Sequence, residues 1–349
     1  MHKTEYIFIS NGYIGGASRF IYDHLNYLVK KNKKTILIDD NPYKTYSRIP
    51  LNTLVKKIVI NQYKTESQKK LRKLLLNDNS KKVIFLTNYA FFIKYFSLIN
   101  KFKNRNIKII LTIHSGLFDL SFKKYIAGLI FSLIYKKIDY LYFGSHSAKK
   151  WWLKFYPWMD IKKNLVHFNG VELQKKIKIK KKNNNLSISF VGRLERENNP
   201  EFFINIAHDY LKNSKDAIFN IYGDGTMYNQ LKNNTSSKKI KFFGWRKKKT
   251  IYKNSDIIII TSQINNFPYV ALEAKSYGIP VISTSKGDIK KIIKNNIDGY
   301  VIYTKSTKKI INLIRKISKN YLEFSNNSIQ RSKLFELNIA CKKFWTNIS

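Results

Sequence analysis

Several features that would assign a function at once are missing from the sequence. Cys341 is the only cysteine in 349 residues, so no disulfide and no cysteine-built zinc site can form within the chain. No run of about 18 uncharged apolar residues is present, so we expect no membrane-spanning helix. The opening segment has a short apolar run without a cleavage-site pattern, so we expect no secretory signal. A reducing compartment fits this composition best.

The glycine motifs of common nucleotide-binding folds are missing as well. Neither G-x-G-x-x-G nor the P-loop pattern G-x-x-x-x-G-K-[ST] occurs. What is present is Gly15-Gly16, between a first apolar run and a helix-like segment at 20–30. A turn of this kind lets the backbone approach a phosphate, and the following helix N-terminus favours an anion. A tight turn between strand and helix accounts for the same residues equally well.

Acidic residues are scarce. The chain has 22 Asp and Glu against 65 Lys and Arg, a formal net charge of +43. This excess predicts attraction to a polyanion, either a nucleic acid or an anionic membrane, where each basic residue near the surface contributes about 1 kcal/mol. A general bias toward Lys, Asn and Ile explains it as well, because the charge is spread over both halves. A nucleic-acid-binding face is usually localised.

Apolar runs alternate with helix-like segments along the whole chain, which predicts parallel α/β structure. Apolar residues make up 44% of the chain, enough for two cores. The expected strands are 6–10, 35–38, 83–86, 109–113, 140–143, 187–191, 217–222, 241–243, 257–260 and 280–283. The expected divisions are a first domain at 1–172, a basic linker at 173–186, a second domain at 187–326 and a C-terminal helical segment at 327–349.

Two segments have the composition of surface helices. Residues 67–76 (SQKKLRKLLL) predict a basic amphipathic helix, and residues 122–140 place an apolar stretch between two lysine pairs. Such helices can lie in the interface of a membrane. A core-facing helix with solvated lysines is an equal alternative for the second segment.

Charged residues in the second half suggest a phosphate site. Arg193 follows a strand-like run, and a guanidinium binds a diphosphate with a bidentate fork. The segment Asn265-Asn266-Phe267-Pro268 predicts a turn into a helix that carries Glu273, about two turns in. The N-terminus of that helix offers N–H groups to phosphate oxygens, and a carboxylate can accept from both hydroxyls of a ribose.

At this point the chain resembles the retaining glycosyltransferases of the GT4 type, most strongly over 187–301. The motifs that carry the resemblance are Gly15-Gly16, His114, Asn169-Gly170-Val171, Val191-Gly192-Arg193-Leu194, Tyr222-Gly223-Asp224-Gly225, Phe243-Gly244-Trp245, Thr261-Ser262, Phe267-Pro268 with Glu273-Ala274, and Gly278-Ile279-Pro280-Val281. The resemblance implies the GT-B fold, which is two Rossmann-like β/α/β domains facing a central cleft. It also implies sugar transfer from a nucleoside-diphosphate donor with retention at the anomeric carbon.

The resemblance also implies roles for single residues. Glu273 would hold the donor ribose, and Arg193 with the backbone of Phe267, Pro268, Tyr269 and Val270 would hold the diphosphate. Gly15 and Gly16 would approach the phosphate or sugar, and His114 would lie beside the transferred sugar. Gly223 and the Gly244-Trp245 turn would flank the base, and the C-terminal helix would pack back on the first domain.

Two positions depart from the family pattern. Asn198 stands where a lysine is usual, and Asn265 stands where a glutamate is usual. Asparagine can still bond a sugar hydroxyl, but it cannot stabilise a cation or act as an acid. Arg196 is near enough in sequence to replace the missing charge. An active enzyme with an atypical donor is the favoured interpretation, and a weakly active or inactive homologue that still binds nucleotide sugars is the alternative.

The remaining expectations concern metal, partners and location. No Asp-x-Asp triplet occurs, so we expect no metal and no cofactor, with Arg193 and helix dipoles stabilising the leaving diphosphate. A histidine at a strand end is often a loop hydrogen-bonder, but His114 falls where a ligand would bind. We expect a glycan or lipid-linked acceptor of lipopolysaccharide or capsule type, and a peripheral position at the cytoplasmic face of the membrane. A nucleic-acid-binding protein is the rival class, and no stacking-aromatic motif supports it.

Overall fold

A computed structural model describes most of the chain. The residues it describes are 4–10, 15–40, 53–60, 69, 72–73, 80–100, 106–114, 122–160, 164–174 and 185–348. The chain divides into two compact units, one of Met1–Phe168 with Ala340–Ser349 and the other of Asn169–Ile339. Most of the predicted amphipathic segment 67–76 and most of the predicted linker lie outside the described residues.

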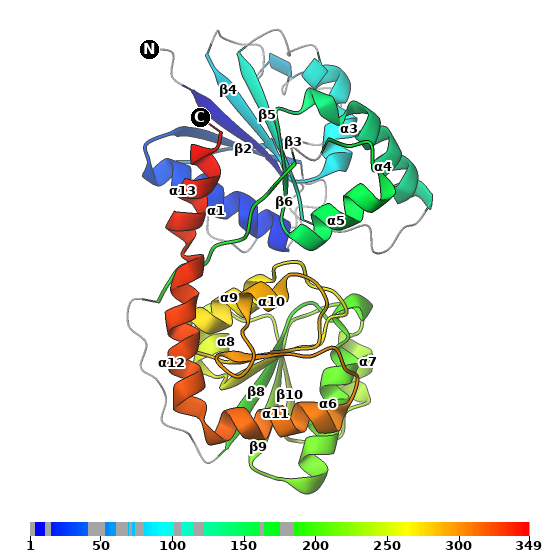
Figure 1. The fold of residues 1–349 in the computed structure, drawn as a ribbon, viewed down its shortest axis with the longest axis vertical. Helices are drawn as coiled ribbons and strands as arrows, with labels where there is room; N and C mark the ends of the chain where they lie inside the picture. The colour runs from blue at the N-terminus through cyan, green and yellow to red at the C-terminus, as the bar shows by residue number, and fades with distance from the viewer. Residues whose placement is uncertain are drawn as a thin grey trace. The chain divides into compact units, whose positions relative to one another are not determined.

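The first unit is a parallel sheet with helices on both faces, in the order β3-β2-β1-β4-β5-β6-β7 (Figure 1). Its elements are β1 (Glu5–Ser10), α1 (Gly16–Lys30), β2 (Lys34–Asp40), β3 (Lys56–Ile60), β4 (Lys82–Leu86), α3 (Tyr89–Asn100), β5 (Ile107–Ile113), α4 (Phe122–Ile134), the 3₁₀ turn Tyr135–Lys137, β6 (Tyr140–Phe143), α5 (His146–Phe155), β7 (Asn164–Val166) and, at the end of the chain, α13 (Leu337–Thr346). Such a doubly covered sheet needs strands that are apolar on both faces.

Strand β1 shows how the pattern builds two cores. Ile7 and Ile9 join the core beneath α3, α4 and α5, whereas Phe8 between them joins the core beneath α1 and α13. Successive side chains of a strand point to opposite faces, so an uninterrupted apolar run serves both layers. Phe344 of α13 is fully buried in the second of these cores.

The second unit repeats this architecture with the order β10-β9-β8-β11-β12-β13. Its elements are β8 (Leu186–Val191), the 3₁₀ turn Arg196–Asn198, α6 (Pro200–Asn213), β9 (Ala217–Tyr222), α7 (Tyr228–Asn233), β10 (Ile240–Gly244), α8 (Lys248–Lys253), β11 (Ile257–Ile260), α9 (Tyr269–Ser276), β12 (Val281–Ser283), α10 (Ile289–Ile292), β13 (Gly299–Val301), α11 (Thr307–Lys319), α12 (Tyr321–Ser332) and the 3₁₀ turn Lys333–Phe335. Helix α11 packs on α6, and α12 packs on α9.

The strand order fixes where a ligand can bind. In both units the first three strands run from the middle of the sheet to one edge, from β1 to β3 and from β8 to β10. The next strand, β4 or β11, then lies on the other side of the first one. In such sheets the crevice lies at the carboxyl ends of the two strands between which the order reverses. Those strands are β1 and β4 in the first unit and β8 and β11 in the second.

The predicted α/β class is confirmed, and each predicted strand is found. Strands β3, β7 and β13 are not predicted, and each lies at the edge of its sheet. The predicted C-terminal helical segment consists of α12, a 3₁₀ turn and α13, of which the residues from Ala340 onward belong to the first unit.

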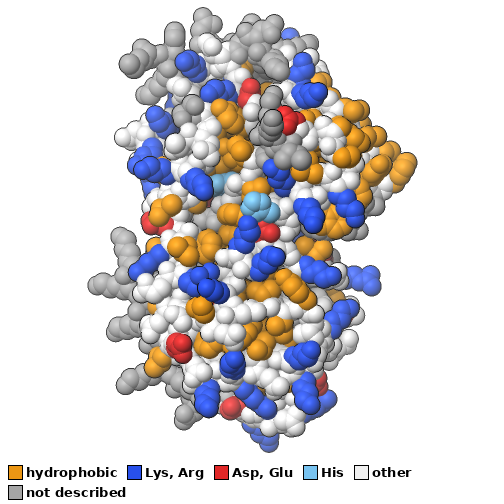
Figure 2. Space-filling view, viewed as in Figure 1, with side chains coloured by type: hydrophobic (Ala, Val, Ile, Leu, Met, Phe, Trp, Pro, Cys, Tyr) orange, Lys and Arg blue, Asp and Glu red, His pale blue; other side chains and the backbone are white. Residues whose placement is uncertain are grey.

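Helix α4 has an exposed apolar face. Phe122, Ile126, Ile130 and Leu133 are 77%, 40%, 43% and 66% exposed. Figure 2 shows hydrophobic side chains gathered over the part of the first unit where Figure 1 places α4. Among the described residues, no helix has the length and apolar character needed to cross a bilayer.

Candidate functional site

Side chains that follow β8 and β11 form a hydrogen-bond network at the carboxyl ends of these two strands, where the strand order of the second sheet reverses. Thr261, directly after β11, donates to the carbonyl of Asn198 (2.9 Å), and Ser262 donates to Asn198 Oδ1 (3.2 Å). Asn198 Nδ2 in turn donates to the carbonyl of Arg193 (2.8 Å), which follows β8. Asn198 therefore fixes the backbone that carries Arg193 beside the end of β11.

Asn265 joins the same network from the far side. Its Nδ2 donates to Ser285 Oγ (3.0 Å), and Ser285 Oγ donates to the carbonyl of Ser262 (2.6 Å). Three predicted site residues, Arg193, Asn198 and Asn265, are thus connected at the carboxyl edge of the sheet. The two asparagines that depart from the family pattern act here as hydrogen-bonding connectors.

The guanidinium of Arg193 lies at the surface. It pairs with Glu197 at 2.7 Å, and both side chains are about 60% exposed. An exposed pair of this kind contributes little to stability, so Arg193 can exchange Glu197 for another anion at small cost.

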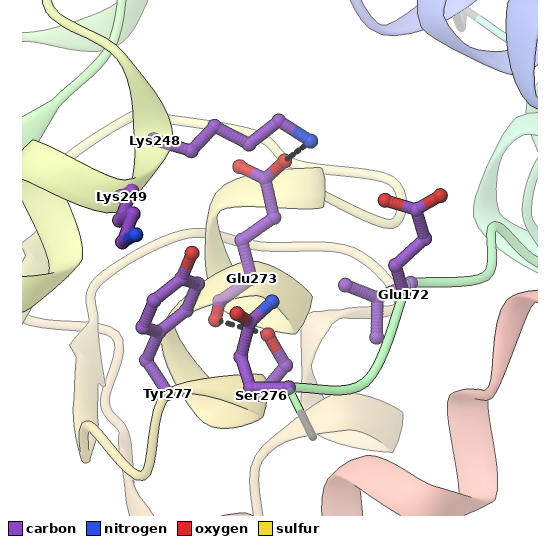
Figure 3. A pocket seen from close by; sticks show the side chains of 8 residues that line it. Glu172, Lys248, Lys249, Glu273, Ser276 and Tyr277 are labelled. Atoms are coloured by element: carbon purple, nitrogen blue, oxygen red, sulfur yellow. Dashed lines mark hydrogen bonds and ion pairs between the residues drawn. The ribbon is translucent and has the colours of Figure 1, made fainter. Parts of the chain in front are cut away.

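Glu273 lies at a separate cavity of about 220 Å³ in the same unit (Figure 3). The residues that line it are Val171, Glu172, Gln174, Lys248, Lys249, Glu273, Ser276 and Tyr277. Arg193 is not among them, so the structure does not place these two predicted residues on one cavity. Glu273 is the fifth residue of α9, about one turn in rather than two.

The carboxylate of Glu273 is held at both oxygens. Lys248 Nζ lies 2.9 Å from Oε1, and the Tyr252 hydroxyl donates to Oε2 at 2.8 Å. The side chain of Glu273 is 13% exposed. Burial, followed by the charges of Glu273 and Glu172, raises the pKa of the Tyr277 hydroxyl. The cavity thus combines two carboxylates with the lysines and hydroxyls that line it.

The predicted phosphate-facing segment begins α9. Phe267 is buried, Pro268 is the N-cap without a side-chain capping bond, and Tyr269 and Val270 are the first helical residues. Asn169 Nδ2 donates to the carbonyl of Phe267 at 2.7 Å and fixes the approach to the helix. An uncapped N-terminus keeps its partial positive charge for an anion.

The residues predicted to flank a base lie at the ends of β9 and β10. Gly223 N donates to the carbonyl of Gly244 (2.9 Å), and Trp245 follows with 43% of its side chain exposed. Gly223 has φ +147°, and a Cβ there would lie 1.8 Å from the carbonyl oxygen of Gly192. Glycine is required for this close approach of two backbones.

The first unit holds the other predicted residues. Gly15 is the N-cap of α1 and Gly16 its first residue, with no capping side chain and no acidic residue in the first turn. His114 follows β5; its Nε2 lies 3.0 Å from Thr112 Oγ1, and its ring meets Phe20 of α1 edge-on at 4.7 Å. Burial lowers the pKa of His114 to about 4, so the imidazole is neutral at physiological pH. The described residues contain no cluster of three or more His, Cys, Asp and Glu that could hold a metal ion.

The sequence interpretation does not identify Lys248 and Tyr252. The run Lys247-Lys248-Lys249 has the composition of a solvated surface, so the sequence gives no reason to expect that Lys248 pairs with Glu273. The available signal is the spacing of four between Lys248 and Tyr252, which places them on one face of a helix.

Comparison with known proteins identifies this unit. Residues 172–335 match the family model of glycosyl transferases group 1. The second unit is therefore similar to the group 1 glycosyl transferases over residues 172–335. The matched segment contains Arg193, Asn198, Asn265 and Glu273 together with the cavity residues Lys248 and Tyr252. The predicted resemblance is therefore confirmed at the level of group 1.

One relative and two solved structures are similar to the chain. Over 168 residues the chain is 30% identical to the UDP-Gal:alpha-D-GlcNAc-diphosphoundecaprenol alpha-1,3-galactosyltransferase of Escherichia coli, a match that spans 46% of this chain and 43% of that enzyme. The structure of HepE from Anabaena in complex with UDP and glucose superposes with a TM-score of 0.76 at 13% identity, covering 100% of this chain and 99% of HepE. Sucrose-phosphate synthase from Thermosynechococcus elongatus gives a TM-score of 0.80 at 13% identity, covering 99% and 98%. The GT-B fold is thereby confirmed.

Proposed function

We propose that the protein transfers a sugar from a nucleoside-diphosphate donor, held by the group 1 domain, to a glycan or lipid-linked acceptor. The observation that carries the proposal is the coincidence of the matched family segment with the reversal point of the second sheet, where Arg193, Asn198 and Asn265 are joined. UDP is the proposed nucleotide, because the similar HepE structure contains UDP and the E. coli relative is named for UDP-Gal.

The donor would be gripped at two places. Glu273 would accept hydrogen bonds from the ribose, while Arg193 and the N-terminus of α9 would face the diphosphate. Arg193 would leave Glu197 for the phosphate oxygens, a change that costs little because the present pair is exposed. Gly223 and Trp245 would flank the base, and Asn265 would face the transferred sugar.

Catalysis would rest on positioning and on electrostatic stabilisation of the leaving diphosphate. We propose that transfer proceeds with retention and without a metal, since Arg193 and the α9 dipole provide positive potential. His114 would act as a neutral hydrogen-bonding group beside the sugar, because its lowered pKa keeps the ring uncharged. Full activity in excess chelator would support metal independence, and activity restored only by a divalent cation would refute it.

A panel of nucleotide sugars tests the assignment, with release of the nucleoside diphosphate as the readout. Arg193→Ala and Glu273→Ala are each expected to abolish release, whereas Lys212→Met, which removes an exposed cation paired with Asp209, leaves it unchanged. Undiminished turnover in both site variants would remove the assignment. Stabilisation by nucleotide sugars without turnover would favour the alternative, a homologue that binds the donor but does not transfer the sugar. Asn198 and Asn265, which depart from the family pattern, are the reason to consider it.

The exposed face of α4 supports a membrane-bound acceptor. Phe122, Ile126, Ile130 and Leu133 occupy one side of the helix, and lysines lie next to them in sequence at 123, 124, 136 and 137. Apolar side chains flanked by lysines are the composition of a helix that lies in the interface of an anionic bilayer. We propose that this surface holds the protein peripherally at the cytoplasmic face of the membrane.

Sedimentation with vesicles of anionic and of neutral lipid tests the membrane proposal. Binding to the anionic vesicles is expected to weaken with salt and to fall in the variant Phe122→Ser/Leu133→Ser. The control is Leu334→Ser, a change at a leucine that is 67% exposed in the second unit. Equal binding of the α4 variant and the control would contradict the role of α4.

A further inference from the structure

We propose that helix α8 is the positioning element for the donor ribose, because Lys248 and Tyr252 fix the carboxylate of Glu273 before the donor arrives. The inference rests on the proposed function, in which Glu273 accepts from the ribose, and it adds two residues that no motif indicates. Neither is assigned to bond formation or cleavage; both act through Glu273.

The geometry is a two-point clamp from one helix face. Lys248 and Tyr252 are one turn apart on α8, and each reaches a different oxygen of the same carboxylate, at 2.9 Å and 2.8 Å. A terminal carboxylate torsion is otherwise broad and roughly two-fold. Contacts at both oxygens restrict this rotation, so the plane of the Glu273 carboxylate is set by α8.

The clamp is anchored in the core of the unit. Tyr252 is 2% exposed, and its ring stacks on Tyr277 with centroids 5.2 Å apart and planes at 29°. Ile251 beside it is also buried, and its carbonyl accepts a hydrogen bond from Ser255 Oγ at 2.8 Å. The hydroxyl that holds Oε2 therefore comes from a fixed ring.

Lys248 adds a charge effect to the orientation. A carboxylate beside a bound diphosphate repels it, and a cation on that carboxylate reduces the repulsion. Lys248 lies on the cavity rim with 42% of its side chain exposed, so it can hold Oε1 while a ligand enters (Figure 3). Fixing an acceptor in its bound orientation improves affinity by reducing the ordering that binding must impose.

Calorimetric titration with UDP and with 2′,3′-dideoxy-UDP separates a role of α8 in ribose binding from a general loss of structure in the variants. Wild type is expected to bind UDP more tightly than the dideoxy analogue. Tyr252→Phe keeps the buried ring and removes one hydrogen bond to a charged group, so its affinity for UDP should fall about tenfold. Its affinity for the dideoxy analogue should be unchanged. Lys248→Met should also lose the preference for UDP, and Lys248→Arg should restore part of it.

The matched control is Lys253→Met, which removes an equal charge from an exposed position on the same helix. It should keep the wild-type preference. With a nucleotide sugar as substrate, Tyr252→Phe should raise KM with little change in kcat, because the clamp acts on binding that the ground state and transition state share.

The outcomes distinguish this inference from the proposal beneath it. If wild type binds UDP and dideoxy-UDP equally, Glu273 does not hold the ribose and the proposed donor geometry is wrong. If wild type prefers UDP and both Tyr252→Phe and Lys248→Met keep the full preference, Glu273 needs no clamp and this inference is overturned.

Discussion

A buried ion cluster beneath α9 gives the sharpest stability prediction. Asp298 accepts hydrogen bonds from Lys275 of α9, from Arg331 Nε of α12 (2.6 Å) and from the backbone N–H of Lys294 (2.7 Å). Lys275 and Asp298 are fully buried, while Arg331 is 25% exposed. One carboxylate therefore joins the helix that carries Glu273 to the helix packed behind it.

The expected loss of unfolding free energy in Asp298→Asn follows from the burial of Lys275. Burial lowers the pKa of Lys275 from 10.5 to about 8, although Asp298 opposes the shift. At about 1.4 kcal/mol per pKa unit, moving Lys275 from water into this site disfavours its charged form, relative to its neutral form, by roughly 3 kcal/mol. Asp298→Asn removes the compensating charge and should lower the free energy of unfolding by about 3–5 kcal/mol.

Replacing both Lys275 and Asp298 should restore most of the lost stability. In Lys275→Met/Asp298→Asn no buried lysine needs a partner, and Arg331 can turn to solvent, so the free energy of unfolding should return to within about 1–2 kcal/mol of wild type. Lys212→Met, at an exposed pair, should cost less than about 1 kcal/mol.

Urea denaturation followed by circular dichroism measures all of these variants. An Asp298→Asn variant that loses less than about 1 kcal/mol, or a double variant as unstable as the single one, would refute the reasoning.

Two further predictions concern acid stability and backbone packing. His24, His114 and His167 all have lowered pKa values, chiefly through burial, the last two at about 4 and about 3. The unfolded chain protonates these histidines below about pH 6.5, whereas the folded unit does not. The free energy of unfolding should therefore fall as pH drops from 7 toward 4, and it should fall less in His24→Phe. A flat urea midpoint between pH 7 and 5 would contradict this. Gly223→Ala should be far more destabilising than Gly244→Ala, because a Cβ at Gly223 meets the carbonyl of Gly192 and one at Gly244 meets nothing within 4 Å; equal midpoints would contradict that.

Most of the strands that the sequence predicts lie in the interior of their sheets and have apolar runs; β10 is the exception, because it is predicted although it lies at an edge and Lys241 is exposed. Ile257–Ile260 consists of four isoleucines in the middle of its sheet, and its pattern is unmistakable. The unpredicted strands Lys56–Ile60, Asn164–Val166 and Gly299–Val301 lie at edges. An edge strand pairs on one side only, so short or lysine-bearing segments suffice there, and their sequences resemble loops.

The candidate site was predictable where it depends on local chemistry. Arg193 at a strand end and Glu273 after a helix-starting turn follow from position alone. The clamp was not predictable, because it requires knowing that α8 faces α9 across the cavity. The spacing of four between Lys248 and Tyr252 places them on one face of a helix, but it does not show which residue they contact. The connecting role of Asn198 likewise depends on Ser262, 64 residues away.

In the proposed donor complex, Glu273 holds the ribose of a nucleoside-diphosphate sugar while Arg193 faces its diphosphate. A crystal structure of the protein with UDP tests this most directly. We expect a ribose hydroxyl within about 3.2 Å of a Glu273 carboxylate oxygen, with Arg193 turned from Glu197 toward the phosphates. A nucleotide bound elsewhere, with no ribose hydroxyl near Glu273, would contradict it.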